Sequence, residues 1–268
     1  MSGIHILISA AVAIFLIFLF IGIRKKLRRK HCLSLRLTEV QREKLINDFP
    51  VFARVPEQLR DELEGLIHVF LAEKSFEACG DLSEVTEHKQ CVIAAEACLL
   101  LVNRRHNYYR KLRSILVYPT AYKARNDQGG EDVRLGESWG SGSVVLAWDS
   151  VVSGGRNDED GSHVAIHEFA HQLDQDDGAG DGVPPLSGGR GAYRDWSLTF
   201  SKAFEKFQRK LDKRKRTVID PYGATNPAEF FAVATETFYE KPKQLHKHYP
   251  DVYEQLRQYY NVDPLKWI

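Results

Sequence analysis

Two histidines stand four residues apart in the stretch HEFAHQLD, residues 167–174, and a glutamate directly follows the first of them. Positions i and i+4 of an α-helix project from the same face, so His167 and His171 could bind one metal ion together. The H-E-x-x-H pattern is typical of zinc sites in which the glutamate, here Glu168, stands beside a bound water. The pattern arises by accident in on the order of one chain in a hundred of this length. It therefore needs a third ligand and a suitable context.

A third ligand has to come from outside this helix. The extended H-E-x-x-H-x-x-G-x-x-H arrangement is excluded, because Asp occupies both of its further positions. Glu205 lies in a stretch rich in Lys and Arg and is expected to face solvent, whereas Glu229 opens the apolar segment NPAEFFAVA. Glu229 also has a structural alternative, since Asn226, Pro227 and Glu229 match a helix-capping box. Both roles are compatible, because a glutamate at the head of a buried helix can reach a neighbouring metal.

A long apolar run opens the chain. Residues 4–23 (IHILISAAVAIFLIFLFIGI) contain no acidic residue, Lys or Arg and would span ~30 Å as a helix, as the bilayer core requires. Six Lys and Arg residues follow within 24–30. No small-x-small cleavage site follows the apolar run, which argues against a cleaved signal peptide. A buried core helix is the structural alternative. We expect residues 1–23 to be a single-pass anchor in the cell (inner) membrane, with the basic side and the following domain in the cytoplasm.

The rest of the chain has the composition of a weakly acidic globular domain. The chain has 37 basic and 36 acidic residues; without the six cations after the apolar run, 31 basic residues face 36 acidic ones, or 31 − 36 = −5. This balance gives no bulk electrostatic reason to bind nucleic acid, so no direct nucleic-acid binding is expected. The four cysteines form no CxxC pair and agree with a reducing compartment.

Short β-rich runs separate two helical regions. Helical periodicity is expected over 56–71 and over 83–103, the latter with Ser83 as its N-cap. The runs SILVYP, EDVRLG and GSVVLAWD indicate strands between Gly and Asn/Asp turns, and GSVVLAWD could align an extended peptide by strand addition. Helices return at HEFAHQLD, capped by Asn157 or Ser162, and further along the chain. The predicted fold class is α+β, a small mixed sheet flanked by several helices, with one domain over 38–268 behind a basic juxtamembrane tether at 24–37.

The two metal-binding segments together resemble a known family. HEFAHQLD followed by YGATNPAEFFAVATETF closely resembles the Mlc titration factor A (MtfA) family of zinc peptidases. Tyr-x-x-x-Asn-x-x-Glu-Phe-Phe-Ala is also similar to the zincin catalytic domain of anthrax lethal factor. IAAEACLLLV and GESWGSGSVVLAWD extend the resemblance to roughly residues 38–262.

The resemblance implies a zincin-like metallopeptidase domain with one zinc ion (Zn2+) per chain. Its metal ligands would be His167, His171 and Glu229, its general base Glu168, and Tyr222 would assist at the developing oxyanion. The sequence alone, without this resemblance, favours a surface residue of the turn DPYG for Tyr222. The resemblance also implies a peptide or protein substrate, aminopeptidase-like activity on small substrates, and a regulatory link to the Mlc repressor of glucose-uptake genes.

Two functions from different classes follow. The leading hypothesis is a membrane-anchored zinc-dependent peptidase that hydrolyses peptide bonds. The alternative is a zinc-stabilised scaffold that binds and sequesters a transcriptional regulator with little or no hydrolysis. The presence of Glu168 favours the enzyme, because a structural zinc site needs ligands but no general base. The anchor departs from the soluble titration factor and allows a membrane substrate or a different partner.

Four other features have mainly structural interpretations. His163 would extend the histidine face but lies a turn too far from His171 to share its metal. Asp174 could accept a hydrogen bond from an imidazole or simply end its helix. DQDDGAGDG departs from a calcium loop because Gly178 replaces a ligand position. Residues 210–216 (KLDKRKR) are expected to be a solvated helix end, with contact to anionic lipid as the alternative.

Overall fold

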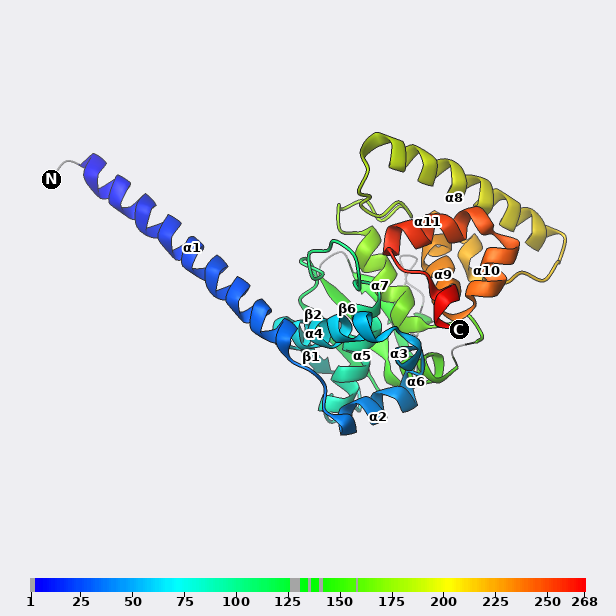
Figure 1. Ribbon diagram of the computed structural model, residues 1–268, viewed down its shortest axis with the longest axis horizontal. Helices are drawn as coiled ribbons and strands as arrows, with labels where there is room; N and C mark the ends of the chain where they lie inside the picture. The colour runs from blue at the N-terminus through cyan, green and yellow to red at the C-terminus, as the bar shows by residue number, and fades with distance from the viewer. Residues whose placement is uncertain (1–2, 126–130, 135, 140–141, 158) are drawn as a thin grey trace.

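The computed structural model describes residues 3–125, 131–134, 136–139, 142–157 and 159–268. Over these ranges the chain is an α+β protein in which many helices surround a small sheet (Figure 1). The helices are α1 (Gly3–Ser34), α2 (Glu39–Asp48), α3 (Val51–Arg54), α4 (Glu57–Glu73), α5 (Glu87–Leu99), α6 (Trp148–Arg156), α7 (Val164–Asp174), α8 (Gly189–Asp212), α9 (Pro227–Glu240), α10 (Pro242–His248) and α11 (Pro250–Tyr260), with short 3-10 turns η1 (Pro221–Ala224) and η2 (Pro264–Trp267). The strands are β1 (Ser75–Ala78), β2 (Ser114–Tyr118), β3 (Tyr122–Arg125), β4 (Glu131–Arg134), β5 (Gly136–Trp139) and β6 (Ser143–Ala147). The predicted fold class is confirmed.

The main sheet has the strand order β1-β2-β6-β5. Strands β1, β2 and β6 run parallel, whereas β5 pairs antiparallel with β6; β3 and β4 form a separate antiparallel pair. The prediction that GSVVLAWD adds a peptide strand is wrong, because β6 lies inside the sheet and its backbone pairs with β2 and β5. Among the described strands, β5 is the one at this edge, so its outer backbone is open to a further strand.

The helices that carry the predicted site meet in an aromatic core. Phe169 of α7 packs edge-on against Phe70 of α4, with ring centroids 5.8 Å apart. Helix α9 is buried from Phe230 to Glu240, so it is enclosed on all sides. Burial on every face explains why most of its residues are apolar and why it lacks the polar stripe of a surface helix.

Two predicted helix starts differ from the structure. The helix expected from Ser83 begins at Glu87, because the Thr86 side chain accepts the hydrogen bond from the Lys89 backbone N–H. Helix α7 is capped by His163, whose Nδ1 accepts from the Ile166 N–H at 3.4 Å, and not by Asn157 or Ser162. An imidazole is an unusual cap, so the preference for Ser, Thr, Asn and Asp pointed to the wrong residues.

Helix α1 projects from the domain as one rod (Figure 1). Its span Leu7–Ser34 is long and apolar enough to cross a membrane. The last turns pack against α4: the Arg29 guanidinium donates to both carboxylate oxygens of Glu73 at 2.6 and 2.7 Å. A Cβ at Gly65 would lie 2.7 Å from the Leu33 carbonyl oxygen, so only glycine allows this close approach. Residues 24–34 of the predicted tether are therefore helical and fixed to the domain.

Candidate active site

Helix α7 directs His167 and His171 away from the core. Phe169 and Leu173 on its other side are buried, which orients the helix and leaves the two imidazoles facing a cavity. Their Nε2 atoms lie 3.1 Å apart. The i, i+4 spacing therefore brings the two nitrogens to one point, as predicted from the sequence.

Glu229 reaches the same point from the first turn of α9. Asn226 caps this helix by accepting from the Glu229 backbone N–H at 2.9 Å, which is one half of the predicted capping box. The Glu229 carboxylate turns to the histidines, and its Oε2 lies 2.9 Å from His167 Nε2 and 3.3 Å from His171 Nε2. The structure thus gives Glu229 a place in the cap and in the histidine cluster.

The three groups fit a zinc ion by type and spacing. Two imidazole nitrogens and one carboxylate oxygen, from His167, His171 and Glu229, lie within 4.8 Å of one another. Tetrahedral zinc with bonds of about 2.0–2.1 Å places its ligand atoms about 3.4 Å apart. The observed separations of 2.9 to 3.3 Å are close to this value. Two histidines and a glutamate also leave one tetrahedral position for water or substrate.

Glu168 lies in the same cavity but takes no part in this cluster. It is buried against β5, and a Cβ at Gly136 would be 2.7 Å from its Oε1. Burial raises the pKa of Glu168 to about 8, and the negative charges of Glu229 and Glu236 act in the same direction. The divalent charge of a bound metal would oppose this shift and favour the carboxylate. A buried carboxyl group with such a shifted pKa is suited to proton transfer.

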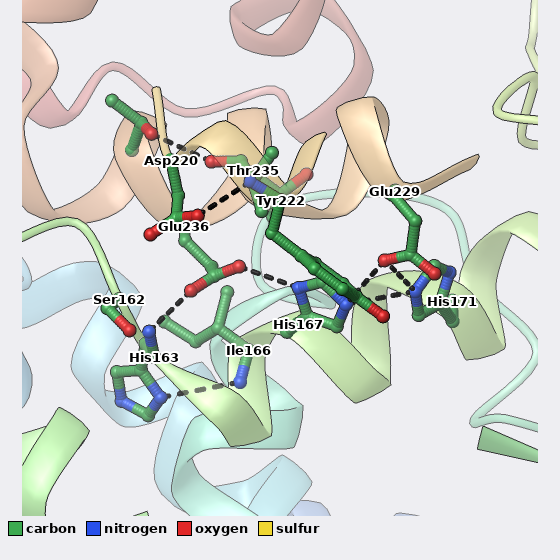
Figure 2. Close-up of polar contacts among 12 residues, drawn as sticks. Ser162, His163, Ile166, His167, His171, Asp220, Tyr222, Glu229, Thr235 and Glu236 are labelled. Atoms are coloured by element: carbon green, nitrogen blue, oxygen red, sulfur yellow. Dashed lines mark hydrogen bonds and ion pairs between the residues drawn. The ribbon is translucent and has the colours of Figure 1, made fainter. Parts of the chain in front are cut away.

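Tyr222 stands over the histidine cluster. The Asp220 side chain accepts from the Tyr222 backbone N–H at 2.8 Å and so fixes the η1 turn. The Tyr222 and His167 rings are 5.9 Å apart between centroids, and Figure 2 shows the tyrosine side chain extending across His167 toward His171. Tyr222 is 57% exposed, which agrees with its interpretation as a surface residue of a turn. It also lines the cavity that contains the histidine cluster.

The sequence analysis missed Glu236. Its Oε1 accepts from His167 Nδ1 at 2.7 Å, and its Oε2 accepts from the His163 backbone N–H (Figure 2). The first bond places a proton on Nδ1, so Nε2 is the ring nitrogen directed at Glu229 and is the one that a metal ion would bind. Glu236 follows Glu229 by seven residues, or two helical turns, so a second glutamate on that face of an apolar helix was the available signal.

The same contacts control the charge of His167. Burial alone would lower the pKa of His167, but its hydrogen bonds with Glu229 and Glu236 raise the pKa well above its usual value. The hydrogen bonds to the two histidines lower the pKa of Glu229 to about 2, although burial opposes this. A positive charge between these groups, supplied by a proton or by a metal ion, is therefore favourable.

The cluster opens into a cavity of about 1100 Å³. Strand β5 forms one wall, and the Gln172 side chain donates to Ser138 Oγ at 2.7 Å, which fixes this strand beside α7. The described lining contains no Lys or Arg but six carboxyl groups, from Glu137, Glu168, Asp181, Asp220, Glu229 and Glu236. Although the raised pKa of Glu168 favours its neutral form, the other five make the cavity electronegative.

Asp174 and His163 lie outside the cavity lining. Asp174 Oδ2 accepts from the Gly182 backbone N–H at 2.8 Å, so the residue fixes the loop after α7 and holds no imidazole through a described contact. Burial raises the pKa of Asp174 to about 6. His163 is fully buried at the helix start, which agrees with its structural interpretation.

Comparison with known proteins identifies relatives over most of the chain. Residues 23–261 match the model of the family described as glucose-regulated metallo-peptidase M90. Protein slr2042 of Synechocystis sp. (strain ATCC 27184 / PCC 6803 / Kazusa) is 42% identical over 225 residues, which cover 81% of each chain. Proteins named Mlc titration factor A from Yersinia pestis and Yersinia pseudotuberculosis are 29% identical over 232 residues, which cover 81% of this chain and 83% of theirs.

Proposed function

The chain belongs to the glucose-regulated metallo-peptidase M90 family, and on this premise we propose that it is a membrane-anchored zinc peptidase with an active site at α7 and α9. One observation carries the proposal: His167, His171 and Glu229 bring three metal-binding atoms within 4.8 Å of one another, and the buried Glu168 lines the same cavity. The scaffold alternative requires the three ligands but gives no reason for a carboxyl group at position 168.

In the proposed mechanism, His167, His171 and Glu229 would hold one zinc ion per chain. A zinc ion in such a site supplies Lewis-acid chemistry: it lowers the pKa of a water to about 7 and polarises a carbonyl group. Glu168 accepts the proton of the attacking water and transfers it to the leaving amine. The Tyr222 hydroxyl donates to the oxyanion that forms on the peptide carbonyl, an interaction commonly worth roughly 3 kcal/mol.

Glu236 acts as a positioning residue in this mechanism. It holds the His167 ring through Nδ1 at 2.7 Å and the start of α7 through the His163 N–H. Both bonds keep the Nε2 atom of His167 directed at the metal position. Such partners of a ligating histidine typically change metal affinity or activity by roughly 10–100-fold when they are replaced.

We propose that the substrate peptide lies along β5. The open edge of this strand borders the cavity through Gly136, Glu137 and Ser138, so a peptide can add as a further strand and present its carbonyl to the cluster. The carboxylates of the cavity favour a positively charged group such as a peptide amino terminus. This preference supports aminopeptidase-like activity.

The anchor and the regulatory partner extend the proposal. The apolar part of α1 supports a single span in the cell (inner) membrane, and the basic residues 24–30 support a cytoplasmic location of the domain. The name of the Yersinia relatives, Mlc titration factor A, supports an Mlc-like transcriptional repressor as a partner, and with it a link to sugar uptake. Direct binding to nucleic acid is not part of the proposal.

The test compares the full chain with Glu168→Gln and the control Glu205→Gln in detergent, on aminoacyl and short-peptide substrates. Glu205 lies on the exposed side of α8, where it pairs with Arg209 at 3.3 Å. We expect Glu168→Gln to lose roughly 10²–10⁴-fold in turnover at unchanged zinc content, and the control to keep its activity. Equal zinc in all three proteins without turnover that depends on Glu168 would contradict the enzyme and favour the scaffold.

A further inference from the structure

We infer that the basic segment 105–113, at the end of the sheet where α1 enters the domain, is a second membrane contact that binds the headgroups of anionic phospholipids. The inference rests on the proposed anchoring by α1 and adds a surface of the globular domain to it. Three exposed arginines of this segment, Arg105, Arg110 and Arg113, would meet the lipid.

The joint between α1 and the domain fixes which surface faces the bilayer. Glu73 ends α4 and binds Arg29 bidentately, and Lys25 adds an ion pair to Glu73 at 3.5 Å. The Arg29 guanidinium also lies over the Tyr108 ring, 3.9 Å from its centroid. Because α1 is one helix through this joint, the span cannot reorient without breaking these contacts. Tyr108 and its neighbours are therefore held beside the basic end of the span.

The distance along α1 places this joint at the level of the headgroups. Arg29 follows the last residue of the apolar run, Ile23, by six positions, or about 9 Å of helix. The headgroup layer extends about 5–8 Å beyond the hydrocarbon core on each side. Tyr108, which contacts Arg29, consequently lies near the outer limit of that layer, and long arginine side chains beside it can reach the phosphates.

The sheet topology brings the basic segment to the same side. Strands β1, β2 and β6 are parallel and begin in register at Ser75, Ser114 and Ser143. Lys74, directly after the Glu73 that binds α1, donates to the carbonyl oxygens of Tyr109 and Leu112 at 2.6 and 2.8 Å. The segment that leads into β2 is thus fixed beside the start of β1, at the end of the sheet that α1 approaches.

Local contacts leave the arginines directed to solvent. Lys111 donates to the Gln175 carbonyl oxygen at 3.0 Å, and Asn107 donates to Asp176 at 2.6 Å, so the acidic loop after α7 is already bound to other residues of the segment. Among the described residues, the guanidinium groups of Arg105, Arg110 and Arg113 make no ion pair or hydrogen bond, although the Arg110 backbone N–H donates to Asn107 and the Arg113 carbonyl oxygen accepts from Ser75. Three unpaired cations beside a polybasic helix end complement an anionic surface, and each contributes on the order of a fivefold preference for contact.

A second basic cluster, residues 210–216, is the alternative candidate for contact with anionic lipid, but it lies far from α1. Residues 210–216 occupy the end of α8 and the turn after it, on the side of the domain opposite to α1 (Figure 1). A rigid α1 joint keeps this cluster away from the bilayer that α1 spans. It therefore provides a matched control with the same number of removable charges.

The experiment measures amide hydrogen exchange of the full chain in nanodiscs made of phosphatidylcholine alone or with added phosphatidylglycerol. The test variant is R105Q/R110Q/R113Q and the control is K213Q/K215Q/R216Q. We expect phosphatidylglycerol to slow exchange over 105–113 by roughly tenfold or more in the natural chain and the control, and high salt or the test variant to abolish the slowing.

The outcomes separate this inference from the anchoring on which it rests. Protected amides in α1 with lipid-independent exchange over 105–113 would overturn the second contact and leave the anchor in place. Equal loss of the slowing in both triple variants would also overturn it, because the effect would then be unspecific. Unprotected α1 amides in nanodiscs would overturn the anchor and the contact together.

Discussion

His163 and His167 lie one turn apart at the start of α7, and both face buried glutamates. His163 Nε2 is 3.5 Å from Glu96 Oε1 without hydrogen-bond geometry; burial lowers the pKa of His163 to about 3 and raises the pKa of Glu96 well above its usual value. Burial therefore favours the neutral form of both groups. At His167, hydrogen bonds to Glu229 and Glu236 overcome burial and favour the charged forms.

The difference between the two pairs lies in their partners and in access to solvent. The His167 pair is hydrogen-bonded on both ring nitrogens and opens into the cavity, so a cation can enter and replace the proton. Glu96 is closed in the core, where Asp48 and Glu240 add negative charge and raise its pKa further. A buried His–Glu pair thus becomes a candidate metal site only when its donors converge and one side stays open.

The largest difference should appear when each histidine is replaced. We expect His167→Ala to lose zinc, and with it turnover by on the order of 10³-fold or more, because the metal supplies several kcal/mol of transition-state stabilisation. His163→Asn retains a side chain that can cap α7, so zinc content and turnover should stay within a few-fold of the natural protein. Metal analysis and peptide turnover of both purified variants test this; zinc loss in His163→Asn would erase the contrast between the pairs.

Replacing the glutamate of each pair should change zinc affinity by a smaller amount, and only for the pair that contains His167. In Glu236→Gln the orienting carboxylate of His167 is lost, and we expect zinc affinity to fall roughly 10–100-fold. In Glu96→Gln the substituted group does not contact the cluster, so zinc affinity should be unchanged. Competition with a chelator measures both affinities, and a similar loss in the two variants would show that buried charge in general, and not the bond to His167, supports the site.

The same contrast explains what the sequence could predict. The i, i+4 histidines and the apolar segment that follows Glu229 are local patterns. Each predicted a helix that the structure contains, with the same residues on it. The strand order is not local: nothing within GSVVLAWD distinguishes an inner strand from an edge strand, so the sequence could not show that both edges of β6 are already paired.

The missed residues depend on tertiary contacts. Gly136 matters because β5 passes close to Glu168, 32 positions along the chain, and Glu236 matters because α9 crosses α7. The prediction of the N-cap residue of α7 was also wrong, because the buried imidazole of His163 occupies the capping position. A sequence pattern identifies which side chains can do chemistry, whereas their partners are decided by packing between distant segments.

The smallest expected effect concerns stability and has opposite signs at two glutamates. Because burial raises the folded-state pKa of Glu96, the folded protein keeps a proton that the unfolded chain releases, and stability falls as pH rises above the unfolded pKa. Glu96→Gln should therefore stabilise the protein near neutral pH, by on the order of 1 kcal/mol, and the gain should vanish in acid.

Glu254 is the control, since its bonds to Arg257 lower its pKa to about 2. Stability from Glu254 is present above the unfolded pKa and is lost as pH falls, so Glu254→Gln should slightly destabilise at neutral pH, by a few tenths of a kcal/mol at this exposed site. Urea unfolding of both variants across the acidic-to-neutral range measures this, and a Glu96→Gln variant that is less stable at neutral pH would mean that Glu96 is ionised and held by a partner.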